Sequence, residues 1–298
     1  MASILYFPLF GLAWLISLIP FRVLYLFSDL LYLIMYYIFP YRKKVVFHNL
    51  RTSFPEKSDE EITRIAKAFY RHFSDFLVEI IKVISLPQKR LDKRVVWKNT
   101  ELFEELAAKK KSIALVSPHY GNWEMQNNVP DKMPHHRCMI IYRPLKSKLT
   151  GRISAYTREK FGAIMIPMEN IFREAMKTKA EGKLFSIWFL ADQRPPRNSR
   201  FWTIFLNHET AFFEGVEKMS RKLELAVVFM NIIKTGRGRY EVHLEKLFDN
   251  AAATAENEVT LTCVSKIEEM IKKAPEYWLW SHKRFKHSRP EGTNLVAR

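Results

Sequence analysis

Hydrophobic positions along the chain recur at different spacings, and each spacing predicts a type of element. Between residues 59 and 84, apolar side chains return every three or four positions, which is typical of one face of an amphipathic helix. Ser58 and Glu61 have the capping-box spacing at its start. From about residue 100 onward, short apolar runs alternate with segments of helical periodicity. This alternation predicts an α/β fold with a mixed, largely parallel central sheet flanked by helices.

The individual elements follow from the apolar runs and from the glycines, prolines and capping residues between them. Strands are predicted at residues 112–117, 138–142, 163–166, 184–190, 225–233 and 240–247. Helices are predicted at residues 100–108, from near residue 123, and at 147–161, 169–181, 211–222 and 255–273. The GRG at 236–238 predicts a turn between two antiparallel strands.

The first forty residues form a hydrophobic segment that contains only two charged side chains. A helix that spans a membrane needs about 20 apolar residues, and this segment is close to that length. Pro8 and Pro20 interrupt it, because proline kinks or ends a helix. One spanning helix and two reclining helices, at 9–19 and 21–39, are therefore alternatives.

We predict that residues 1–40 anchor the protein to a membrane and are retained, since no signal-peptide cleavage pattern is present. Basic residues at 42–44 follow directly, which places the rest of the chain on the cytoplasmic side. That remainder, 41–298, divides into a helical lead-in at 41–98 and an α/β core at 99–298. A buried hydrophobic hairpin of a soluble protein is the alternative to the anchor.

The charge balance indicates an anionic partner. The chain carries 48 Lys and Arg against 31 Asp and Glu, a formal net charge of +17. Nucleic acid, an acidic membrane surface, and an acidic carrier or substrate all fit this excess. Cys138 and Cys263 match no C-x-x-C pattern, so we expect two small buried side chains rather than a disulfide framework or a zinc site.

The sequence SPHYGNWE at 117–124 places chemically capable residues directly after a predicted buried strand. A tight turn would bring His119 and Glu124 together, with Gly121 supplying backbone freedom and Asn122 capping the following helix. A general base that works near neutral pH needs an imidazole and an acceptor that fixes its tautomer, and Glu124 is the expected acceptor. Since G-x-S-x-G is absent, the base would activate a substrate hydroxyl directly. The spacing does not match the H-E-x-x-H of zinc enzymes.

HYGNWE resembles the H-x4-D/E motif of the glycerolipid acyltransferase superfamily, in the form found in the late, or secondary, acyltransferases of lipid A biosynthesis. The resemblance covers most of the chain and follows the same order. It includes YRKKVVFHNLRTSFPEKSDEEI (41–62), YRPLKS (142–147), ADQRPP (191–196) and PEYWLWSHKRF (275–285). Many members of that family carry a threonine and a glycine at this point, and this chain keeps Thr210 and Gly215. Phe212 and Phe213 between them are a departure that leaves acyl chain length open.

The resemblance implies roles for individual residues. His119 would be the general base with Glu124 as its partner, and 41–298 would be an acyltransferase catalytic domain. The residues expected to contact substrate are Asn122, Arg143, Asp192, Gln193 and Arg194. Alternatives are a surface position for Arg143 and a loop-capping role for Asp192 and Gln193. A structural role against the neighbouring tryptophans is the alternative for the basic run at 282–284.

The implied reaction transfers a fatty acyl chain from an acyl thioester to a hydroxyl of a lipid A precursor. The donor would be acyl carrier protein or coenzyme A, and we expect no metal or other cofactor. The implied partners are the lipid bilayer, acyl carrier protein and a phosphorylated glycolipid, at the cytoplasmic side of the bacterial inner membrane. An aminolipid or another glycolipid is an alternative acceptor. A membrane-tethered nucleic-acid-binding protein is a more distant alternative, because the sequence contains no zinc-finger, RNP or helix-turn-helix signature.

Overall fold

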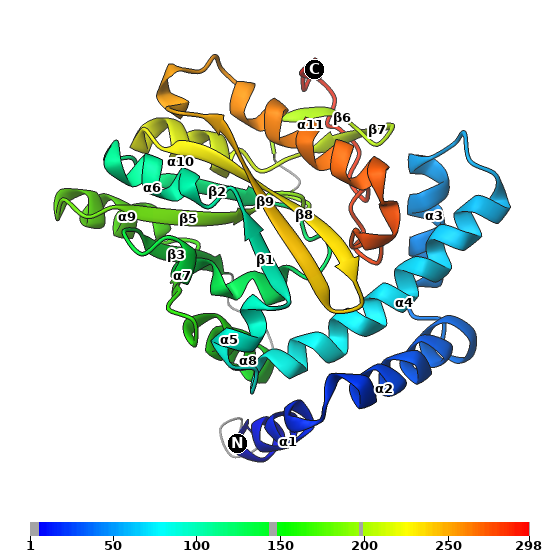
Figure 1. Ribbon diagram of the computed structural model, residues 1–298. Helices are drawn as coiled ribbons and strands as arrows, with labels where there is room; N and C mark the ends of the chain where they lie inside the picture. Colours follow the sequence, from blue (N-terminus) through cyan, green and yellow to red (C-terminus); the bar gives the residue numbers. More distant parts are fainter. Residues whose placement is uncertain (1–5, 143–147, 197–198, 298) are drawn as a thin grey trace.

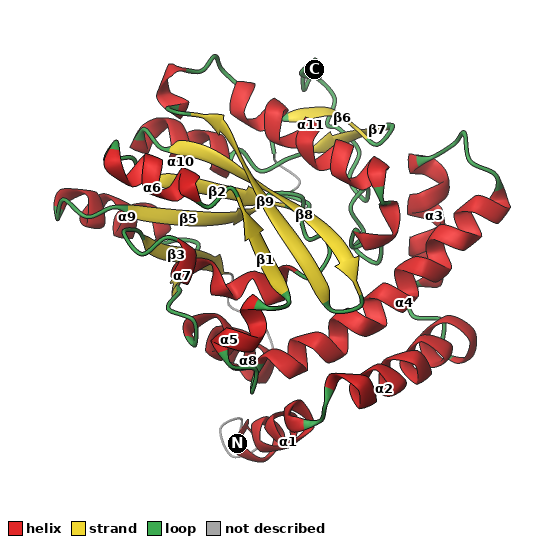
Figure 2. Ribbon diagram, in the orientation of Figure 1, coloured by secondary structure: helices red, strands yellow, loops and turns green. Residues whose placement is uncertain are grey.

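A seven-stranded sheet forms the centre of the protein. The computed structural model describes residues 6–142, 148–196 and 199–297. The strand order is β1-β9-β8-β2-β5-β3-β4, and helices flank the sheet (Figures 1 and 2). The strands are β1 Val95–Lys98, β2 Ile113–Ser117, β3 Arg137–Tyr142, β4 Ile164–Pro167, β5 Phe185–Leu190, β8 Ala226–Gly236 and β9 Arg239–Phe248.

Most neighbouring strands in this sheet are parallel. Among the described residues of this sheet, the only antiparallel pair is β8 with β9, which confirms the hairpin predicted around residue 237. Strands β8, β2, β5, β3 and β4 run one way, and β9 and β1 run the other. Every residue of β2 is buried, because a central parallel strand is covered on both faces. The predicted α/β class with a largely parallel sheet is confirmed.

The helices that cover the sheet come mainly from the connections between strands. They are α5 Gln88–Asp92, α6 Glu101–Ala108, α7 Val129–Lys132, α8 Lys148–Glu159, α9 Ile171–Ala180, α10 Gly215–Leu223 and α11 Glu258–Lys273. Short helical turns complete the core: η2 Trp123–Asn128, η3 Ala251–Ala253 and η4 Pro275–Tyr277. Cys138 and Cys263 are both buried and unpaired, as expected.

Helix α4, Asp59–Val83, connects the N-terminal helices to the sheet. Its predicted capping box is present: the Glu61 amide donates to the Ser58 hydroxyl at 3.3 Å, and the Ser58 amide donates to the Glu61 carboxylate at 3.0 Å. Helix α3, Lys43–Ser53, packs against it. The predicted end at residue 84 is one residue beyond the observed end.

The N-terminal segment forms two helices rather than one. Helix α1 is Tyr6–Leu18, α2 is Phe21–Leu33, and a π-helical turn at Ile34–Ile38 continues α2. The break falls at Pro20, whose ring cannot continue a helix. By length and composition, Phe21–Ile38 could cross a membrane. Figure 1 nevertheless shows α2 lying along α4, and the two helices are in contact.

Several elements differ from the prediction. A small hairpin, β6 Trp202–Phe205 and β7 His208–Ala211, was not predicted, and α10 begins at Gly215 rather than at residue 211. Leu206 and Asn207 form its turn, both with positive φ. A two-residue turn with this geometry usually has the sequence Asn-Gly. A leucine occupies the first position here, so the sequence did not indicate the turn. Strand β1 was also not predicted.

Candidate active site

Two loops at one edge of the sheet bring His119 and Asp192 together. Strand β2 ends at Ser117 and β5 at Leu190, and these two residues are partners in the parallel register. His119 and Asp192 therefore each follow the end of a neighbouring strand by two residues. Ligands of parallel sheets bind at this carboxyl edge, where both loops were expected.

The His119 imidazole is hydrogen-bonded to the Asp192 carboxylate. Nδ1 of His119 lies 2.6 Å from Oδ1 of Asp192, and the same oxygen accepts the His119 backbone N–H at 3.0 Å. The other oxygen accepts the indole N–H of Trp278 at 2.7 Å. Asp192 is 3% exposed. Its burial raises its pKa, but the charge and hydrogen bonds of His119 and the bond from Trp278 together lower that pKa to about 2.

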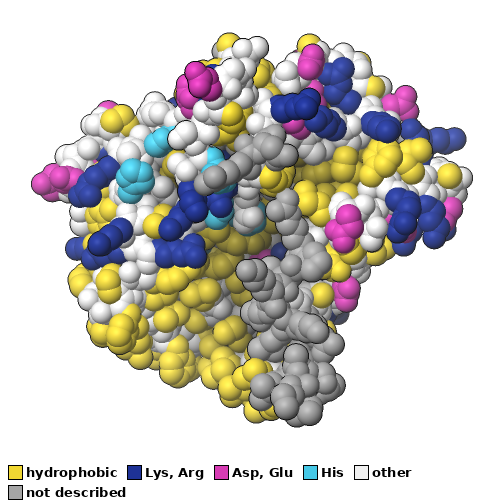
Figure 3. Space-filling view, turned by 180° about the vertical axis from the view of Figure 1, so that it is seen from behind, with side chains coloured by type: hydrophobic (Ala, Val, Ile, Leu, Met, Phe, Trp, Pro, Cys, Tyr) yellow, Lys and Arg dark blue, Asp and Glu magenta, His cyan; other side chains and the backbone are white. Residues whose placement is uncertain are grey.

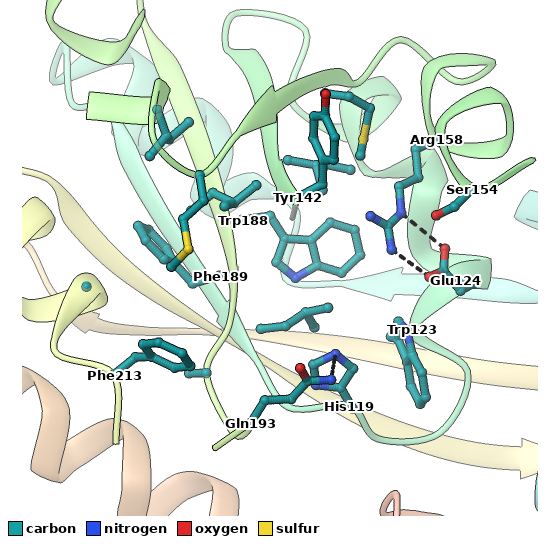
Figure 4. Close-up of a pocket in the computed structure, with 18 of the residues that line it drawn as sticks. His119, Trp123, Glu124, Tyr142, Ser154, Arg158, Trp188, Phe189, Gln193 and Phe213 are labelled. Carbon is teal, nitrogen blue, oxygen red and sulfur yellow. Dashed lines mark hydrogen bonds and ion pairs between the residues drawn. The ribbon is translucent and has the colours of Figure 1, made fainter. Parts of the chain in front are cut away.

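The second ring nitrogen of His119 faces the amide of Gln193. Nε2 of His119 lies 3.0 Å from Nε2 of Gln193, and Figure 4 shows the two side chains in contact. A neutral imidazole that donates from Nδ1 to a carboxylate has its acceptor lone pair at Nε2. The Gln193 amide then donates to this nitrogen. The arrangement leaves Nε2 as the basic atom.

The predicted contact between His119 and Glu124 is corrected by the structure. Glu124 instead accepts two hydrogen bonds from the Arg158 guanidinium on α8, at 2.6 and 3.2 Å, and Figure 4 shows this pair apart from the imidazole. The reason lies in the turn: Gly121 has a φ of +58° and Asn122 starts a 3₁₀ turn rather than an α-helix. The Glu124 carboxylate is thereby directed to α8.

A largely apolar pocket opens beside His119. It has a volume of about 750 Å³, within the usual range for ligand sites of about 300–1,000 Å³. Its polar members include His119, Glu124, Arg158, Gln193 and Arg194. The apolar wall comes from β3, the segment around β4, β5 and α10: Ile140, Ile141, Met165, Met168, Ile171, Trp188, Phe189, Leu190, Val216 and Met219. Figure 4 shows Trp188 and Phe189 projecting into the space across from His119.

The family model described as bacterial lipid A biosynthesis acyltransferase matches residues 3–287. The chain belongs to this family. A lipid A biosynthesis lauroyltransferase of Escherichia coli K12 is 24% identical over 286 residues, which cover 95% of this chain and 91% of the relative. A lipid A biosynthesis palmitoleoyltransferase of the same organism is 24% identical over 257 residues, covering 86% and 82%. A lipid A biosynthesis acyltransferase of Haemophilus influenzae is 24% identical over 242 residues, covering 78% and 72%.

Membership in the lipid A acyltransferase family establishes the coarse chemistry. The protein is an O-acyltransferase, and the family supports acyl transfer onto lipid A. The chain spans nearly the whole length of the first relative. The apolar pocket beside an imidazole–carboxylate pair is the part of the structure that suits such chemistry.

Asn122 supports the turn after β2 from within the protein. It is fully buried, and its side-chain oxygen accepts the Met125 amide at 3.2 Å, which confirms the predicted cap. Its amide nitrogen donates to Glu79 of α4 at 2.7 Å. Asn122 does not line the pocket, so the predicted contact with substrate is replaced by a structural role.

Asp192, another predicted substrate contact, is buried and does not line the pocket. The other predicted contacts divide between the pocket wall and the undescribed segments. Gln193 and Arg194 line the pocket, and Arg194 also donates to the Lys283 carbonyl at 3.0 Å. Arg143 lies outside the described residues. Arg284 is buried, donates to the Ala211 carbonyl at 2.6 Å and has its pKa lowered to about 9 by burial. Its position fits the structural alternative for the run at 282–284.

Several residues that shape the site were not singled out from the sequence. Glu79 is completely buried and accepts hydrogen bonds from Asn122, Tyr240 and Tyr25 at 2.7, 2.9 and 3.0 Å. His72 contacts the Gly121 carbonyl through Nε2 at 3.0 Å. A signal for them was available, because His72, Asp75, Glu79 and Lys82 follow helical spacing on a face of α4 that is otherwise apolar.

Proposed function

We propose that this acyltransferase moves a fatty acyl group from a thioester of acyl carrier protein or coenzyme A to a hydroxyl of a lipid A precursor. His119 acts as the general base, and no covalent acyl-enzyme forms. The observation that carries this proposal is the hydrogen bond between His119 and the buried Asp192, at the wall of a pocket that is mostly apolar. No metal or other cofactor takes part in the proposed reaction.

In the proposed step, the acceptor hydroxyl takes the place of the Gln193 amide at Nε2 of His119. The hydroxyl oxygen attacks the thioester carbonyl as Nε2 removes its proton. The C–O bond forms, the C–S bond breaks, and the imidazolium returns the proton to the leaving thiolate. Asp192 stabilises the imidazolium, since its low pKa keeps it ionised at neutral pH. Acid–base assistance of this kind contributes about 10²–10⁴-fold.

The oxyanion that develops on the thioester carbonyl needs hydrogen-bond donors. The backbone N–H groups of Tyr120 and Gly121 already donate to the carbonyls of Pro118 and Tyr277. The Gln193 amide, which is displaced from His119 by the acceptor, is the donor that we propose for this role. A donor placed at an oxyanion contributes roughly 10²–10³-fold.

The pocket provides separate places for the two substrates. We propose that the acyl chain lies against the apolar wall formed by β3, β5 and α10. Arg194 faces the phosphorylated acceptor in this proposal, because a guanidinium binds phosphate through paired hydrogen bonds. The position of Arg194 supports this proposal, because it lines the pocket from the loop after β5.

Attachment to the membrane is proposed to use the outer face of α1 and α2. Side chains that are 54–68% exposed lie along this face: Leu12, Leu15, Leu26, Phe27 and Leu30. Figure 3 shows hydrophobic side chains gathered along the lower edge of the protein, with a band of Lys and Arg above them. The site would then lie at the cytoplasmic surface of the bacterial inner membrane.

Helix α2 is proposed to lie in the membrane surface rather than to span the bilayer. Its inner face makes polar contacts with α4, including Ser28 with Asp75 at 2.7 Å and Tyr25 with Glu79 at 3.0 Å. Arg237 joins Asp75 to Asp29 of α2. A spanning orientation would break these contacts and leave their polar groups in hydrocarbon, which is costly.

Mass spectrometry of lipids tests the proposed function. The purified protein is incubated with a lipid A precursor and with acyl carrier protein or coenzyme A thioesters of defined chain length. We expect the precursor to gain the mass of one acyl chain. Mild alkaline treatment should remove this chain, because it is attached through an ester bond. Acylation of an amine, or of an aminolipid in preference to the precursor, would contradict the proposed acceptor.

A further inference from the structure

A second cavity, separate from the catalytic pocket, lies at the junction of α1 and α2. It has a volume of about 490 Å³ and shares no lining residue with the catalytic pocket. Its apolar lining comes from the junction and the end of α4. The remaining lining residues are all basic: Arg22, Lys82, Arg90, Lys93, Arg94 and Arg239. Six cations and no carboxylate line this cavity, with the charge of Glu79 acting on Arg94 from outside the lining. Such a lining favours anions.

Two of these cations form the inner part of the cavity and are held in place by the fold. Lys82 is 7% exposed and donates to the carbonyls of Ser17 and Ile19, at 2.6 and 3.0 Å. Arg94 donates to the Gly238 carbonyl at 3.0 Å and its guanidinium lies over the Phe21 ring at 3.4 Å. These contacts fix the α1–α2 junction against α4 and β9.

The other four cations surround the mouth and are not neutralised within the described part of the chain. Arg22, Arg90, Lys93 and Arg239 are exposed, and no ion pair is found for them among the described residues. Basic side chains elsewhere on the protein are commonly paired, as Lys132 is with Asp92 and Arg289 with Glu209. Like charges around one cavity repel one another, and a bound anion would reduce that repulsion.

The surroundings of the cavity indicate where that anion comes from. The cavity is bordered by the exposed apolar face of α1 and α2, where Leu15, Leu18 and Val23 are 59%, 50% and 41% exposed. Figure 1 places the α1–α2 junction below α5 and the end of α4, and the cavity there has both apolar and basic lining residues. Phosphate groups lie at this depth when an apolar face enters the interface of a bilayer.

We propose that this cavity binds the phosphate headgroup of an anionic phospholipid and fixes the depth and orientation of the protein on the membrane. The proposal rests on the membrane attachment described above. It goes beyond it by assigning a defined phosphate site that is separate from the substrate pocket. Lys82 and Arg94 form the inner wall that faces the phosphate, and the four mouth cations attract it.

Vesicle flotation with matched variants tests this proposal. The full chain is compared on neutral phosphatidylcholine vesicles and on vesicles that also contain phosphatidylglycerol. The cavity variant carries Arg22→Gln, Arg90→Gln and Lys93→Gln. The control variant carries Lys110→Gln, Lys177→Gln and Lys273→Gln, three exposed lysines away from the cavity, and therefore has the same net charge.

We expect the wild type and the control variant to prefer the anionic vesicles strongly, and the cavity variant to lose that preference by on the order of 100-fold. All three proteins should bind neutral vesicles equally and transfer acyl groups equally in detergent.

An equal loss of the anionic preference in both variants would overturn the site and attribute the preference to general surface charge. If the wild type binds inorganic phosphate but shows no preference for the anionic vesicles, the cavity is a site for free phosphate and the phospholipid assignment is wrong. If the wild type binds neither kind of vesicle, membrane attachment through α1 and α2 is also wrong. If the wild type binds both kinds equally, only the phosphate site is wrong and the proposed attachment stands.

Discussion

Nδ1 of His119 lies 2.6 Å from Oδ1 of Asp192, although 73 residues separate the two in the sequence. The pair exists because β2 and β5 are parallel neighbours whose ends coincide. The carboxylate inside the H-x4-E motif itself is bound to Arg158. The residue that orients the imidazole therefore comes from a different loop than the motif suggests.

The Asp192 carboxylate should be required for a fast chemical step. Asp192→Asn keeps the size of the side chain but removes the charge that stabilises the imidazolium. We expect kcat to fall about 10²–10⁴-fold, with KM for the thioester little changed. Steady-state kinetics on the folded variant measure this, with circular dichroism as the control. A kcat within a few-fold of wild type would show that Asp192 only supports the loop.

Glu124 and Arg158 should behave as one unit. Both side chains are largely buried, at 13% and 14% exposure, so removing either leaves the other charge without its partner. We expect Glu124→Gln and Arg158→Gln to lower kcat/KM to a similar degree, and the double variant to be little worse than either. The interaction energy from this cycle should fall at about 0.5–3 kcal/mol.

A much milder effect of Arg158→Gln than of Glu124→Gln would contradict this account of the pair. It would mean that Glu124 acts on His119 or on the substrate directly during the reaction. The same double-mutant cycle supplies both outcomes, and thermal unfolding of each variant controls for loss of fold.

The buried His72 should make the protein less stable at mildly acidic pH. Burial and the neighbouring charge of Lys234 lower the pKa of His72 to about 3, from the ordinary 6.5. Below pH 6.5 the unfolded chain binds a proton at this position and the folded chain does not, so the free energy of unfolding falls as pH drops toward 3. Between pH 7 and pH 5 the loss is about 2 kcal/mol.

His72→Gln removes this titration and can still donate to the Gly121 carbonyl. Urea unfolding at pH 7 and pH 5 should therefore show a smaller loss of stability for the variant than for the wild type. Carboxylates titrate in both proteins and cancel in the comparison. Equal losses in the two proteins would show that His72 is protonated in the folded state.

Gly215 offers a way to shorten the acyl pocket. It lines the pocket at the start of α10, and a Cβ added there would meet nothing within 4 Å. Gly215→Met would fill part of the space without straining the backbone. We expect the preference for long over short acyl donors to fall about tenfold or more, since each methylene in such a pocket is worth about 10–200-fold. Competition between thioesters of two chain lengths measures the ratio, and an unchanged ratio would place the acyl chain elsewhere.

The fold was largely predictable because its signals are local and strong. Helix α4 has a capping box and a long apolar face, and the central strands are continuous apolar runs, so their positions were predicted to within one or two residues. Strand β1 was missed because its four residues alternate buried and exposed, and it is formed only by pairing with β9, which lies far along the chain.

The site was predictable in its location but not in its pairings. The sequence placed His119 and the loop at 191–200 at the same edge of the sheet, and the structure confirms that they meet. Choosing Asp192 over Glu124 as the partner of His119 requires the direction of each side chain, which depends on Gly121 and on the short 3₁₀ turn. The contact of α8 with Glu124 is likewise a tertiary property.

Single-turnover acyl transfer by His119→Ala tests the central claim most directly. The folded variant, in detergent, receives a saturating thioester and a lipid A precursor, and its chemical rate is compared with that of the wild type. Our account predicts a rate lower by several orders of magnitude with unchanged binding to vesicles. A rate near that of the wild type would contradict the assignment of His119 as the base.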